Sequence, residues 1–425
     1  MAPTRQVVVV GAGVVGLCVA EALQREGHAV TVLERAPFAR DGASFGNAGL
    51  IVPSHVVPLA APGVLGQGLR WMLERESPFF IEPRLDRDLV RWGWAFLRSS
   101  TAAHVARSAP LLRDLHLRSR ALHRTLAQRL PGARIPTASG LLLVCGSEHG
   151  LAEESALAER AAALGLDVEV MDAAGVAAKL PATDVRAIGG VYFRDDAHAS
   201  PRGLMEALQK GLGERGVSLR WGADVVAVER RGDRVTGVRL AEGARVEADV
   251  VVLAGGAATG RLVRSLGVRM PLQAGRGYSV TVAEPPQRPE LPLILSEARV
   301  AVSPLPEGVR VGGTMEIVSP KRPPDTRRVV GIARGVERYL PAFRSETLTA
   351  LPVWTGARPV SGDGLPYLGR LPTARQVIVA TGHGMLGFSL APVTAALVAD
   401  LVAERPVDLD LALLAPERFT GRHVR

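Results

Sequence analysis

Two glycine clusters, one near each end of the chain, have the spacing of a nucleotide-binding site. The first follows a run of four valines and places Gly11, Gly13 and Gly16 in the pattern Gly-x-Gly-x-x-Gly. In such a turn the first glycine allows a tight bend, the second lets the backbone approach a pyrophosphate, and the third lets a helix pack against the strand. The N–H groups at the start of that helix then face the phosphates. The second cluster spans residues 382–387.

An acidic residue follows at the position where the ribose of a nucleotide needs it. Glu34 comes directly after the second predicted strand, Ala29–Leu33, and a carboxylate about 20 residues after the first glycine accepts hydrogen bonds from ribose hydroxyls. Strand, turn, helix and carboxylate thus occur in the order that dinucleotide binding requires. We therefore predict dinucleotide binding; a glycine-rich turn without a ligand is the alternative.

The composition is that of a soluble globular protein. The chain has 425 residues, of which 47% are hydrophobic and 22% charged, and this length suggests two domains. The net charge of +9 is carried mostly by arginines that are dispersed along the chain. No nucleic-acid recognition module accompanies them, so we expect no nucleic-acid partner. The charge supports only a mildly favourable field for anionic substrates or anionic lipid.

Cysteine content and the N-terminal sequence bear on the compartment. Cys18 and Cys145 are the only cysteines, and neither has the spacing of a metal ligand. We therefore predict a reducing compartment, no disulfide and no metal. The strand that begins at Gln6 leaves no room for a signal peptide, and no apolar run approaches the length of a membrane span. These features predict a cytoplasmic protein.

Aromatic residues crowd one helical segment of the chain. A membrane or quinone contact is one interpretation of them, but aromatic residues at helical spacing are more often part of a core. The residues concerned are Trp71, Met72, Trp92, Trp94 and Phe96.

Three separated segments have the apolar sequence of buried parallel strands. They are 7–10, 249–254 and 376–380, and glycines follow each of them. One discontinuous domain that contains all three fits a flavoprotein better than a nicotinamide dehydrogenase, whose binding domain is usually one continuous piece. We predict a cofactor-binding domain from residues 1–85, 197–265 and 350–425, and a substrate-binding domain from residues 86–196 and 266–349.

Hydrophobic periodicity and the placing of glycine and proline predict the other elements. The expected helices lie within 63–130, 151–164, 201–213 and 387–403, and the expected strands within 141–145, 190–194, 217–246 and 272–311.

Together these motifs resemble the D-amino-acid oxidase and dehydrogenase superfamily of FAD enzymes, which includes glycine oxidase. Ser44–Pro53 matches the Ser-x-x-Asn-Ala-Gly-x-x-x-Pro loop of bacterial D-amino-acid dehydrogenases, and Gly277–Ser279 matches their Gly-Tyr-Ser strand. The segments 356–359, 363–369 and 382–384 match the C-terminal FAD signature. The resemblance spans the chain and implies an α/β plus α+β fold: a discontinuous Rossmann-type FAD-binding domain and a mixed-sheet substrate-binding domain.

Within the superfamily, two segments resemble the bacterial D-hydroxyproline dehydrogenases: Gly46–His55 and Gly384–Gly387. The chain departs from glycine oxidase at Met385, where an arginine is common in the last glycine loop. A substrate contact of that kind is therefore not carried over.

The resemblance implies FAD, and we expect it to be bound non-covalently because neither Cys18 nor Cys145 is well placed beside the isoalloxazine. The residues expected to contact it are Gly11, Ala12, Gly13, Val14, Val15, Gly16, Glu34, Arg35, Ser44, Asn47, Ala48, Gly49, Leu50, Val226, Ala254, Gly255, Gly382, His383, Gly384, Met385, Leu386 and Gly387.

Three residues are the catalytic candidates. Arg358 is expected to anchor the substrate carboxylate, because a guanidinium group binds a carboxylate through two parallel hydrogen bonds; a structural salt bridge or a flavin contact is the alternative. Tyr278 is expected to hydrogen-bond the substrate, or else to be an ordinary strand tyrosine. His55 is expected over the substrate face of the flavin, or else in a surface loop. For His383 we expect a contact through the backbone, with a contact through the ring as the alternative.

The resemblance implies an FAD-dependent dehydrogenase of D-amino acids, with cis-4-hydroxy-D-proline as one substrate. Hydride transfer from Cα to flavin N5 gives an imine, and a quinone or carrier protein takes the electrons. The imine yields a 2-oxo acid and ammonia, or a pyrroline carboxylate from a cyclic amine. One alternative is an oxygen-using oxidase of glycine, sarcosine or a similar amine. Another is a flavin subunit that needs partner chains, and a nicotinamide dehydrogenase is the weakest.

Overall fold

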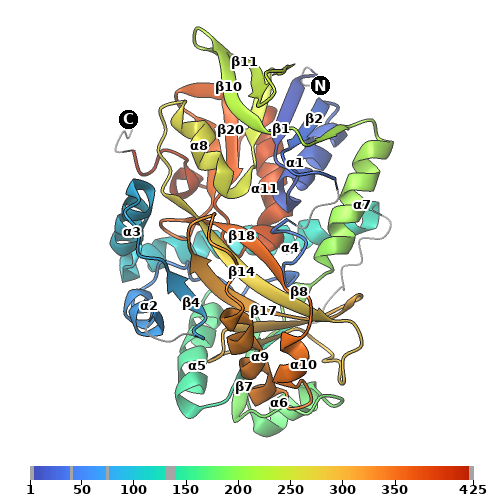
Figure 1. The fold of residues 1–425 in the computed structure, drawn as a ribbon, viewed down its shortest axis with the longest axis vertical. Helices are drawn as coiled ribbons and strands as arrows, with labels where there is room; N and C mark the ends of the chain where they lie inside the picture. The colour runs from blue at the N-terminus through green and yellow to red at the C-terminus, as the bar shows by residue number, and fades with distance from the viewer. Residues whose placement is uncertain (1–3, 39–41, 73–75, 131–139, 421–425) are drawn as a thin grey trace.

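The computed structural model describes residues 4–38, 42–72, 76–130 and 140–420. Figure 1 shows two parts, one built on a six-stranded sheet and the other on a nine-stranded sheet, with α4 (Ala102–Arg129) between them. The molecule is therefore organised around two sheets, as the resemblance implies.

The six-stranded sheet joins the segments expected to form buried parallel strands. Its strands are parallel except for the edge strand β19, which is antiparallel to β20. Their order across the sheet is β19 (Tyr367–Leu371), β20 (Ala374–Thr381), β13 (Val250–Leu253), β1 (Gln6–Val10), β2 (Ala29–Glu34) and β9 (Ser218–Trp221).

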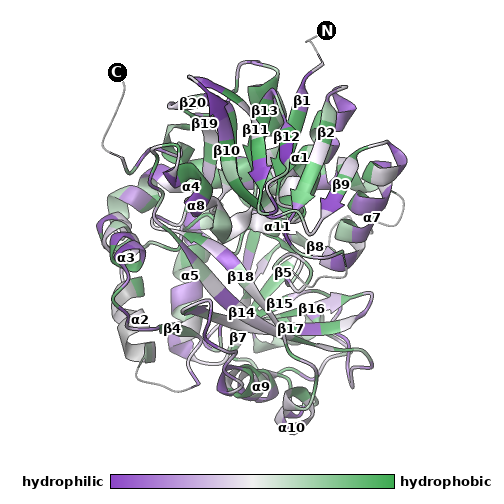
Figure 2. Cartoon of the chain, turned by 45° about the horizontal axis from the view of Figure 1, so that its top comes forward, coloured by the Kyte–Doolittle hydropathy of each residue, from purple (hydrophilic) through white to green (hydrophobic). Residues whose placement is uncertain are grey.

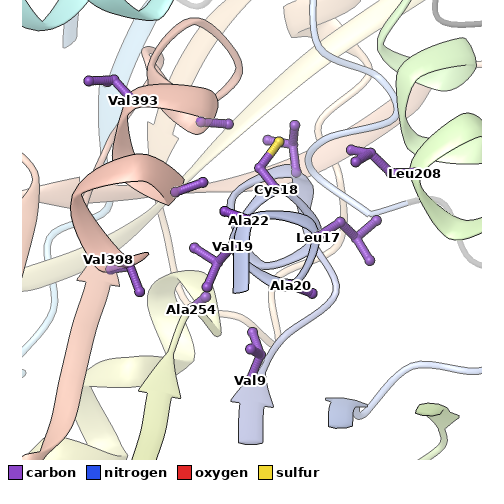
Figure 3. Close-up of a cluster of buried hydrophobic side chains, with 14 of the residues drawn as sticks. Val9, Leu17, Cys18, Val19, Ala20, Ala22, Leu208, Ala254, Val393 and Val398 are labelled. Carbon is purple, nitrogen blue, oxygen red and sulfur yellow. The ribbon is translucent and has the colours of Figure 1, made fainter. Parts of the chain in front are cut away.

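Apolar side chains cover both faces of this sheet, and Figure 2 colours β1, β2 and β13 as hydrophobic. On one face Val9 and Leu17 share a core cluster with Leu208, Val393 and Val398 (Figure 3). The helices that contribute to that cluster include α1 (Val14–Arg25), α7 (Pro201–Glu214) and α11 (Gly387–Val402), and α4 adds Leu112, Leu115 and Leu126.

A small antiparallel sheet and a short helix cover the other face. Val8, Val10 and Leu33 pack there against Val228 and Val238. The covering elements are β10 (Val225–Arg231), β11 (Arg234–Leu240), β12 (Arg245–Glu247), the 3₁₀ turn η1 (Gly256–Ala258) and α8 (Thr259–Arg264).

The nine-stranded sheet is mixed, as the proline-broken segment 272–311 predicts. The strands along its main path are β18 (Trp354–Ser361), β14 (Leu272–Val282), β17 (Gly308–Ile317), β16 (Val300–Leu305), β15 (Leu293–Leu295), β5 (Leu141–Cys145), β7 (Gly189–Phe193) and β6 (Val168–Asp172), and β4 (Phe79–Ile81) pairs with β17.

Helices pack against this second sheet, and a two-stranded ribbon follows the Asn-Ala-Gly loop. The helices are α2 (Val64–Met72), α3 (Arg87–Ser99), α5 (Glu148–Ala163), α6 (Ala173–Lys179), α9 (Arg327–Tyr339) and α10 (Ser345–Thr349). The ribbon is β3 (Leu50–Ile51) and β8 (Ala197–His198). Within 63–130, the three helices α2, α3 and α4 are interrupted by the short strand β4.

Helix α4 and strand β18 are among the elements that connect the two parts of the molecule. Helix α4, from the segment 86–196, packs against α11 of the six-stranded part. Strand β18, from the segment 350–425, lies in the nine-stranded sheet. The division into two domains by residue range stays a prediction.

Candidate functional site

A cavity of about 450 Å³ lies at the carboxyl ends of β1, β2, β13 and β20. Ligands of open α/β sheets bind in this position. Both parts of the molecule contribute to its wall, because the carboxyl-end loops of the six-stranded sheet face residues 355–359 of β18.

The glycine turn has the close contacts that the sequence predicts. Gly11 has a φ of +104°, and a Cβ there would lie 2.6 Å from the carbonyl oxygen of Ala254. A Cβ on Gly16 would lie 1.9 Å from the carbonyl oxygen of Gly11. Helix α1 begins at Val14 after Gly13, which provides no side-chain cap. Gly13, Val14 and Val15 line the cavity, so the start of the helix faces it, as a pyrophosphate site requires.

Glu34 stabilises this turn through hydrogen bonds. Its Oε2 accepts a hydrogen bond from the N–H of Ala12 at 2.8 Å, and its Oε1 accepts one from Ala36 at 3.0 Å. Glu34 and Arg35 both line the cavity. Since each carboxylate oxygen can accept more than one hydrogen bond, Glu34 fits a role in ribose binding as well as a structural role.

The loop that precedes β3 is held at several points. Ser44 Oγ accepts a hydrogen bond from the N–H of Val14 at 3.0 Å. Asn47 Oδ1 accepts one from Gly49 at 2.7 Å and so closes a short turn. Gly49 has a φ of +75°, and a Cβ there would lie 2.0 Å from the carbonyl oxygen of Ala199. The glycine of this motif is therefore required by the packing of the loop.

Two residues of the nine-stranded sheet hold the same loop. Arg310 Nη1 donates to the carbonyl oxygens of Phe45 at 2.9 Å and Asn47 at 2.8 Å. Ser279 Oγ donates to the carbonyl oxygen of Gly46 at 3.2 Å. Arg310 is not among the residues predicted from the sequence, because arginine is abundant in this chain and nothing in the spacing of Arg310 marks it.

The C-terminal cluster meets the cavity through its backbone. Burial lowers the pKa of His383 to about 4, and its Nε2 lies 2.9 Å from Thr394 Oγ1 of α11. The ring is therefore neutral and directed into the core. The N–H of Gly384 donates to the carbonyl oxygen of Pro359 at 2.8 Å, which joins this cluster to β18. Met385 is 50% exposed and lies outside the cavity wall.

Arg358 is a partly buried cation at the cavity wall. Its Nη1 donates to the carbonyl oxygen of Thr314 at 2.7 Å. Among the described residues, no acidic side chain lies within ion-pair distance of Arg358. Burial lowers the pKa of Arg358 to about 10, so the group stays charged at neutral pH. A charge that is partly removed from water and has no acidic partner favours an anionic ligand, which makes Arg358 a strong candidate for binding one.

Tyr278 is a strand residue whose side chain lies away from the cavity. Its side chain is 1% exposed in the core behind the nine-stranded sheet, outside the cavity wall. Its hydroxyl donates to Glu316 Oε2 at 2.5 Å and accepts from the N–H of Asp325 at 2.9 Å. Glu316 also accepts from Arg328 Nε at 2.9 Å. Because its hydroxyl is already engaged in this network, Tyr278 fits the ordinary strand tyrosine that was the alternative.

His55 lies just past β3 in a polar cluster, outside the cavity wall. Its Nδ1 is 3.0 Å from Ser54 Oγ, which donates to Asp196 Oδ2 at 2.5 Å. Burial lowers the pKa of His55 to about 4. Burial also raises the pKa of Asp196 to about 7, although hydrogen bonds from Ser54 oppose that shift. The substrate contact expected of His55 stays a prediction.

The residues predicted to contact FAD divide into two groups. Those that line the cavity are Gly11, Gly13, Val14, Val15, Glu34, Arg35, Ser44, Asn47, Ala254, Gly255, His383, Gly384 and Gly387. Those outside its wall are Ala12, Gly16, Ala48, Gly49, Leu50, Val226, Gly382, Met385 and Leu386. Val226 is 45% exposed, whereas its neighbour Val225 lines the cavity, because successive side chains of a strand point to opposite faces.

Comparison with known proteins places the chain in a family. Residues 6–401 match the family described as FAD dependent oxidoreductase. The chain belongs to this family. A D-amino acid dehydrogenase of Cereibacter sphaeroides is 34% identical over 99% of this chain and 97% of its own length. A D-amino acid dehydrogenase of Methylobacterium radiotolerans is 33% identical over 96% of this chain and 98% of its own length.

Solved structures share the fold of this FAD-dependent oxidoreductase. Glycine oxidase from Geobacillus kaustophilus has a TM-score of 0.77 at 22% identity and covers 98% of this chain and 99% of its own. L-proline dehydrogenase from P. horikoshii has a TM-score of 0.74 at 18% identity and covers 99% of each chain. The predicted fold class is thereby confirmed.

Neither a membrane-spanning helix nor a metal-binding cluster occurs among the described residues. None of the helices within 4–38, 42–72, 76–130 and 140–420 has the length and apolar character that crossing a membrane requires. The same ranges contain no group of His, Cys, Asp and Glu side chains arranged to hold a metal ion.

Proposed function

We propose that this FAD-dependent oxidoreductase is a D-amino-acid dehydrogenase. Two findings support the proposal. Relatives named D-amino acid dehydrogenase are more than 30% identical over nearly the whole chain. Arg358 is a charged group at the cavity wall with no acidic partner among the described residues, and it suits the carboxylate that every amino acid carries.

The residues at the cavity fit FAD, and each part of the wall has a task. When bound, FAD supplies an acceptor for the hydride that leaves the substrate Cα. The start of α1 would hold the pyrophosphate and Glu34 the ribose. The loop 44–47 and the backbone of 382–387 would hold the flavin ring. Arg310 and Ser279 keep that loop in place from the neighbouring sheet.

Arg358 orients the substrate, and the chemistry at Cα follows from that orientation. An amine that arrives neutral, or loses its proton on binding, gives up hydride without a dedicated base once Cα faces the acceptor. Binding groups then supply most of the rate enhancement. The imine product hydrolyses to a 2-oxo acid and ammonia, or is a pyrroline carboxylate when the substrate is a cyclic amine such as cis-4-hydroxy-D-proline.

One experiment tests the substrate class. Purified enzyme is mixed anaerobically with D- and L-amino acids, including both hydroxyproline epimers, and bleaching of the flavin absorbance is followed. D-amino acids should bleach the flavin and their L-enantiomers should not. Bleaching by L-amino acids alone, or by none of the panel, would contradict the proposal.

For the electron acceptor we propose a quinone or a carrier protein, with oxygen as the alternative. Stopped-flow reoxidation of the reduced enzyme compares the two directly. A dehydrogenase is reoxidised faster by a soluble quinone than by air-saturated buffer. The reverse order would make the protein an oxidase. Size-exclusion chromatography with an activity assay then shows whether the chain works without partner subunits.

We also propose that one face of α3 contacts an anionic membrane surface. Of the aromatic residues on this helix, Trp92 and Phe96 are buried and stacked on each other. In contrast, Val90, Trp94 and Leu97 are 66%, 61% and 52% exposed. Their spacing of four and three residues puts them on one side of the helix. The exposed face of α3 is therefore apolar in its own right.

Basic residues border this apolar face. Arg87, Arg91 and Arg98 are exposed on the same helix, and Arg87 and Arg98 form no ion pair within the described ranges. An exposed apolar stripe beside cations suits a bilayer that contains anionic lipid. Each cation near such a surface contributes about 1 kcal/mol to binding.

Co-sedimentation with vesicles of phosphatidylcholine, with and without phosphatidylglycerol, tests this contact. Binding should require the anionic lipid and should fall in Trp94→Ser/Leu97→Ser and in Arg87→Gln/Arg98→Gln. The matched control is Val170→Ser/Ile188→Ser, two exposed apolar residues elsewhere. Equal loss in the control, unchanged binding in the α3 variants, or α3-dependent dimerisation of the protein would refute a membrane role for this face.

A further inference from the structure

The guanidinium group of Arg358 rests on an irregular part of the nine-stranded sheet. Arg276 of β14 pairs with Glu316 of β17, but Tyr278 pairs with Gly313. Between these two pairs the chain advances by three residues in β17 but by only two residues in β14. This is a β-bulge, with one residue of β17 in excess.

Thr314 lies in this bulge with a φ of +64°. A β-branched residue rarely adopts this left-handed conformation, because its side chain is crowded by the backbone. Strained residues of this kind persist only where their surroundings hold them, and they occur preferentially at functional sites. Here the N–H of the next residue, Met315, donates to the carbonyl oxygen of Pro78 at 2.8 Å and holds the bulge from outside.

The bulge gives Arg358 its one hydrogen-bond partner among the described residues. The carbonyl oxygen of Thr314 accepts from Arg358 Nη1 at 2.7 Å. The guanidinium group has four further N–H donors, and within the described ranges these make no other hydrogen bond. One N–H of the guanidinium group is thus held by Thr314, while its other N–H donors are available for a ligand.

Gly277, opposite the bulge, provides the space that Arg358 occupies. A Cβ at Gly277 would lie 2.2 Å from Arg358 Nη2 and 2.3 Å from its Cζ. The φ of Gly277 is not positive, so its backbone conformation does not require glycine. Glycine is required because the guanidinium group of Arg358 occupies the position of a side chain. This contact gives a physical reason for the glycine in the Gly-Tyr-Ser motif.

We infer that Gly277 and Thr314 form a seat that positions Arg358 for the substrate carboxylate. The inference rests on the proposed role of Arg358 in binding that carboxylate. Gly277 and Thr314 are positioning residues: the glycine leaves room for the guanidinium group, and the backbone of Thr314 fixes its orientation. Because rate depends steeply on the angle at which Cα is presented, the seat affects turnover as well as binding.

Gly277→Ala is the principal test, with Gly275→Ala on the same strand as its control. The added methyl at 277 meets the flexible end of Arg358, so the fold should tolerate it while the guanidinium group moves. At 275 the nearest atom is Val360 Cγ2, at 2.7 Å. We expect Gly277→Ala to raise KM for D-amino acids about tenfold or more and to lower kcat. Gly275→Ala should leave the KM close to that of the wild type.

A ligand measurement separates positioning from general damage to the fold. Binding of propionate and of propionamide to the FAD-loaded protein is followed by the shift in the thermal unfolding midpoint. Gly277→Ala should remove the preference for the acid over the amide. A variant that is merely destabilised would bind both ligands equally less well and keep the preference, and that result would overturn the inference.

Thr314→Gly tests whether the backbone of this residue is what matters. Glycine adopts positive φ without strain, so the carbonyl oxygen stays on Arg358. Both the KM and the acid preference should therefore change less in Thr314→Gly than in Gly277→Ala, because the carbonyl oxygen that accepts from Arg358 is still present. Loss of both in Thr314→Gly would assign the contact to the threonine side chain and contradict the inference.

Arg358→Gln distinguishes failure of this inference from failure of the proposed function. If Arg358→Gln keeps the preference for propionate, Arg358 is not the carboxylate anchor and the proposed role fails. If Arg358→Gln loses the preference but Gly277→Ala keeps it, the anchor stands and only the seat is wrong.

Discussion

Arg358 is a charged group that the fold partly buries, with the carbonyl oxygen of Thr314 as its partner instead of a carboxylate. Burial costs the cation its hydration, and one hydrogen bond from a neutral carbonyl returns only part of that free energy. A bound carboxylate would return the remainder. This imbalance is the physical basis for expecting the strongest substrate effects at this residue.

Arg358→Lys should damage the enzyme although it keeps the charge. A single ammonium group cannot reproduce the planar fork that binds both carboxylate oxygens. We expect KM to rise and kcat to fall, the latter by up to about a hundredfold, because a tilted substrate presents Cα poorly. Steady-state kinetics with D-amino acids and their amides measures both constants. The kcat/KM of the amides relative to that of the amino acids should be higher in the variant than in the wild type. Loss of FAD with intact amino-acid binding in the remainder would instead make Arg358 a cofactor residue.

At Glu34 the expected effect is on the cofactor. Both carboxylate oxygens accept backbone hydrogen bonds from the glycine turn and from Ala36, so Glu34→Ala removes support for the turn as well as a ribose contact. A charge-assisted hydrogen bond contributes about 1.5–3 kcal/mol, so FAD affinity should fall about ten- to a hundredfold. Fluorescence titration of the apoprotein with FAD measures the affinity. Hydride transfer in the loaded fraction should be near normal; slowed transfer at full occupancy would contradict this role.

At the scale of elements, α4 presents buried histidines to α11. His116 Nδ1 lies 2.9 Å from Ser389 Oγ, and His123 Nε2 lies 3.1 Å from the carbonyl oxygen of Phe388. Burial lowers the pKa of His116 to about 3 and of His123 to about 4. Both rings are therefore neutral in the folded protein and can take up a proton near pH 6.5 only after unfolding.

This contact makes folding stability dependent on pH in a defined direction. Between pH 6.5 and pH 4 the unfolded chain binds protons that the folded chain excludes, so stability is lost as pH falls. For His123 alone the loss from pH 7.5 to pH 5 is about 2 kcal/mol. Urea denaturation at both pH values should show that His123→Gln loses less stability than the wild type over this interval. An equal loss in the two proteins would mean that His123 titrates normally.

The elements also differ in how far the sequence predicts them. The ends of β5 and the start of α7 agree with prediction, because a continuous apolar run and a proline in the first helical turn are strong local signals. Strand β4, in contrast, has three residues inside a segment that reads as helical. It is a strand because β17 provides an edge for it to pair with, and no local pattern reveals such a partner.

At the scale of the whole molecule, the sequence predicts the cofactor better than the substrate site. The residues of the glycine turn are close in sequence, so their spacing alone indicates the shape of the turn. Arg358, Gly277 and Thr314 come from three strands, and their meeting depends on a bulge and on strand pairing across the sheet. Tyr278 illustrates the limit: its motif is visible in the sequence, but alternation along β14 directs its side chain into the core.

The way FAD is held also depends on the whole molecule, and we predict that it is non-covalent. Covalent attachment in related flavoproteins uses a cysteine or histidine beside the isoalloxazine. Cys18 and Cys145 are buried, and burial raises the pKa of both thiols, that of Cys145 to about 12. The rings of His55 and His383 are turned to Ser54 and Thr394. None of these four side chains is therefore placed as a free nucleophile at the cavity.

Acid precipitation of the purified protein should therefore leave the yellow colour in the supernatant. Milder removal of FAD should lower the midpoint of thermal unfolding, because a ligand that binds only the folded state stabilises it in proportion to RT ln(1 + [L]/Kd). Added FAD should restore the midpoint, whereas FMN, which lacks the adenosine that Glu34 and the glycine turn would hold, should restore it less. Colour in the acid pellet would show a covalent bond, and His55 and His383 would then be the residues to replace first, since a histidine ring nitrogen can form such a bond.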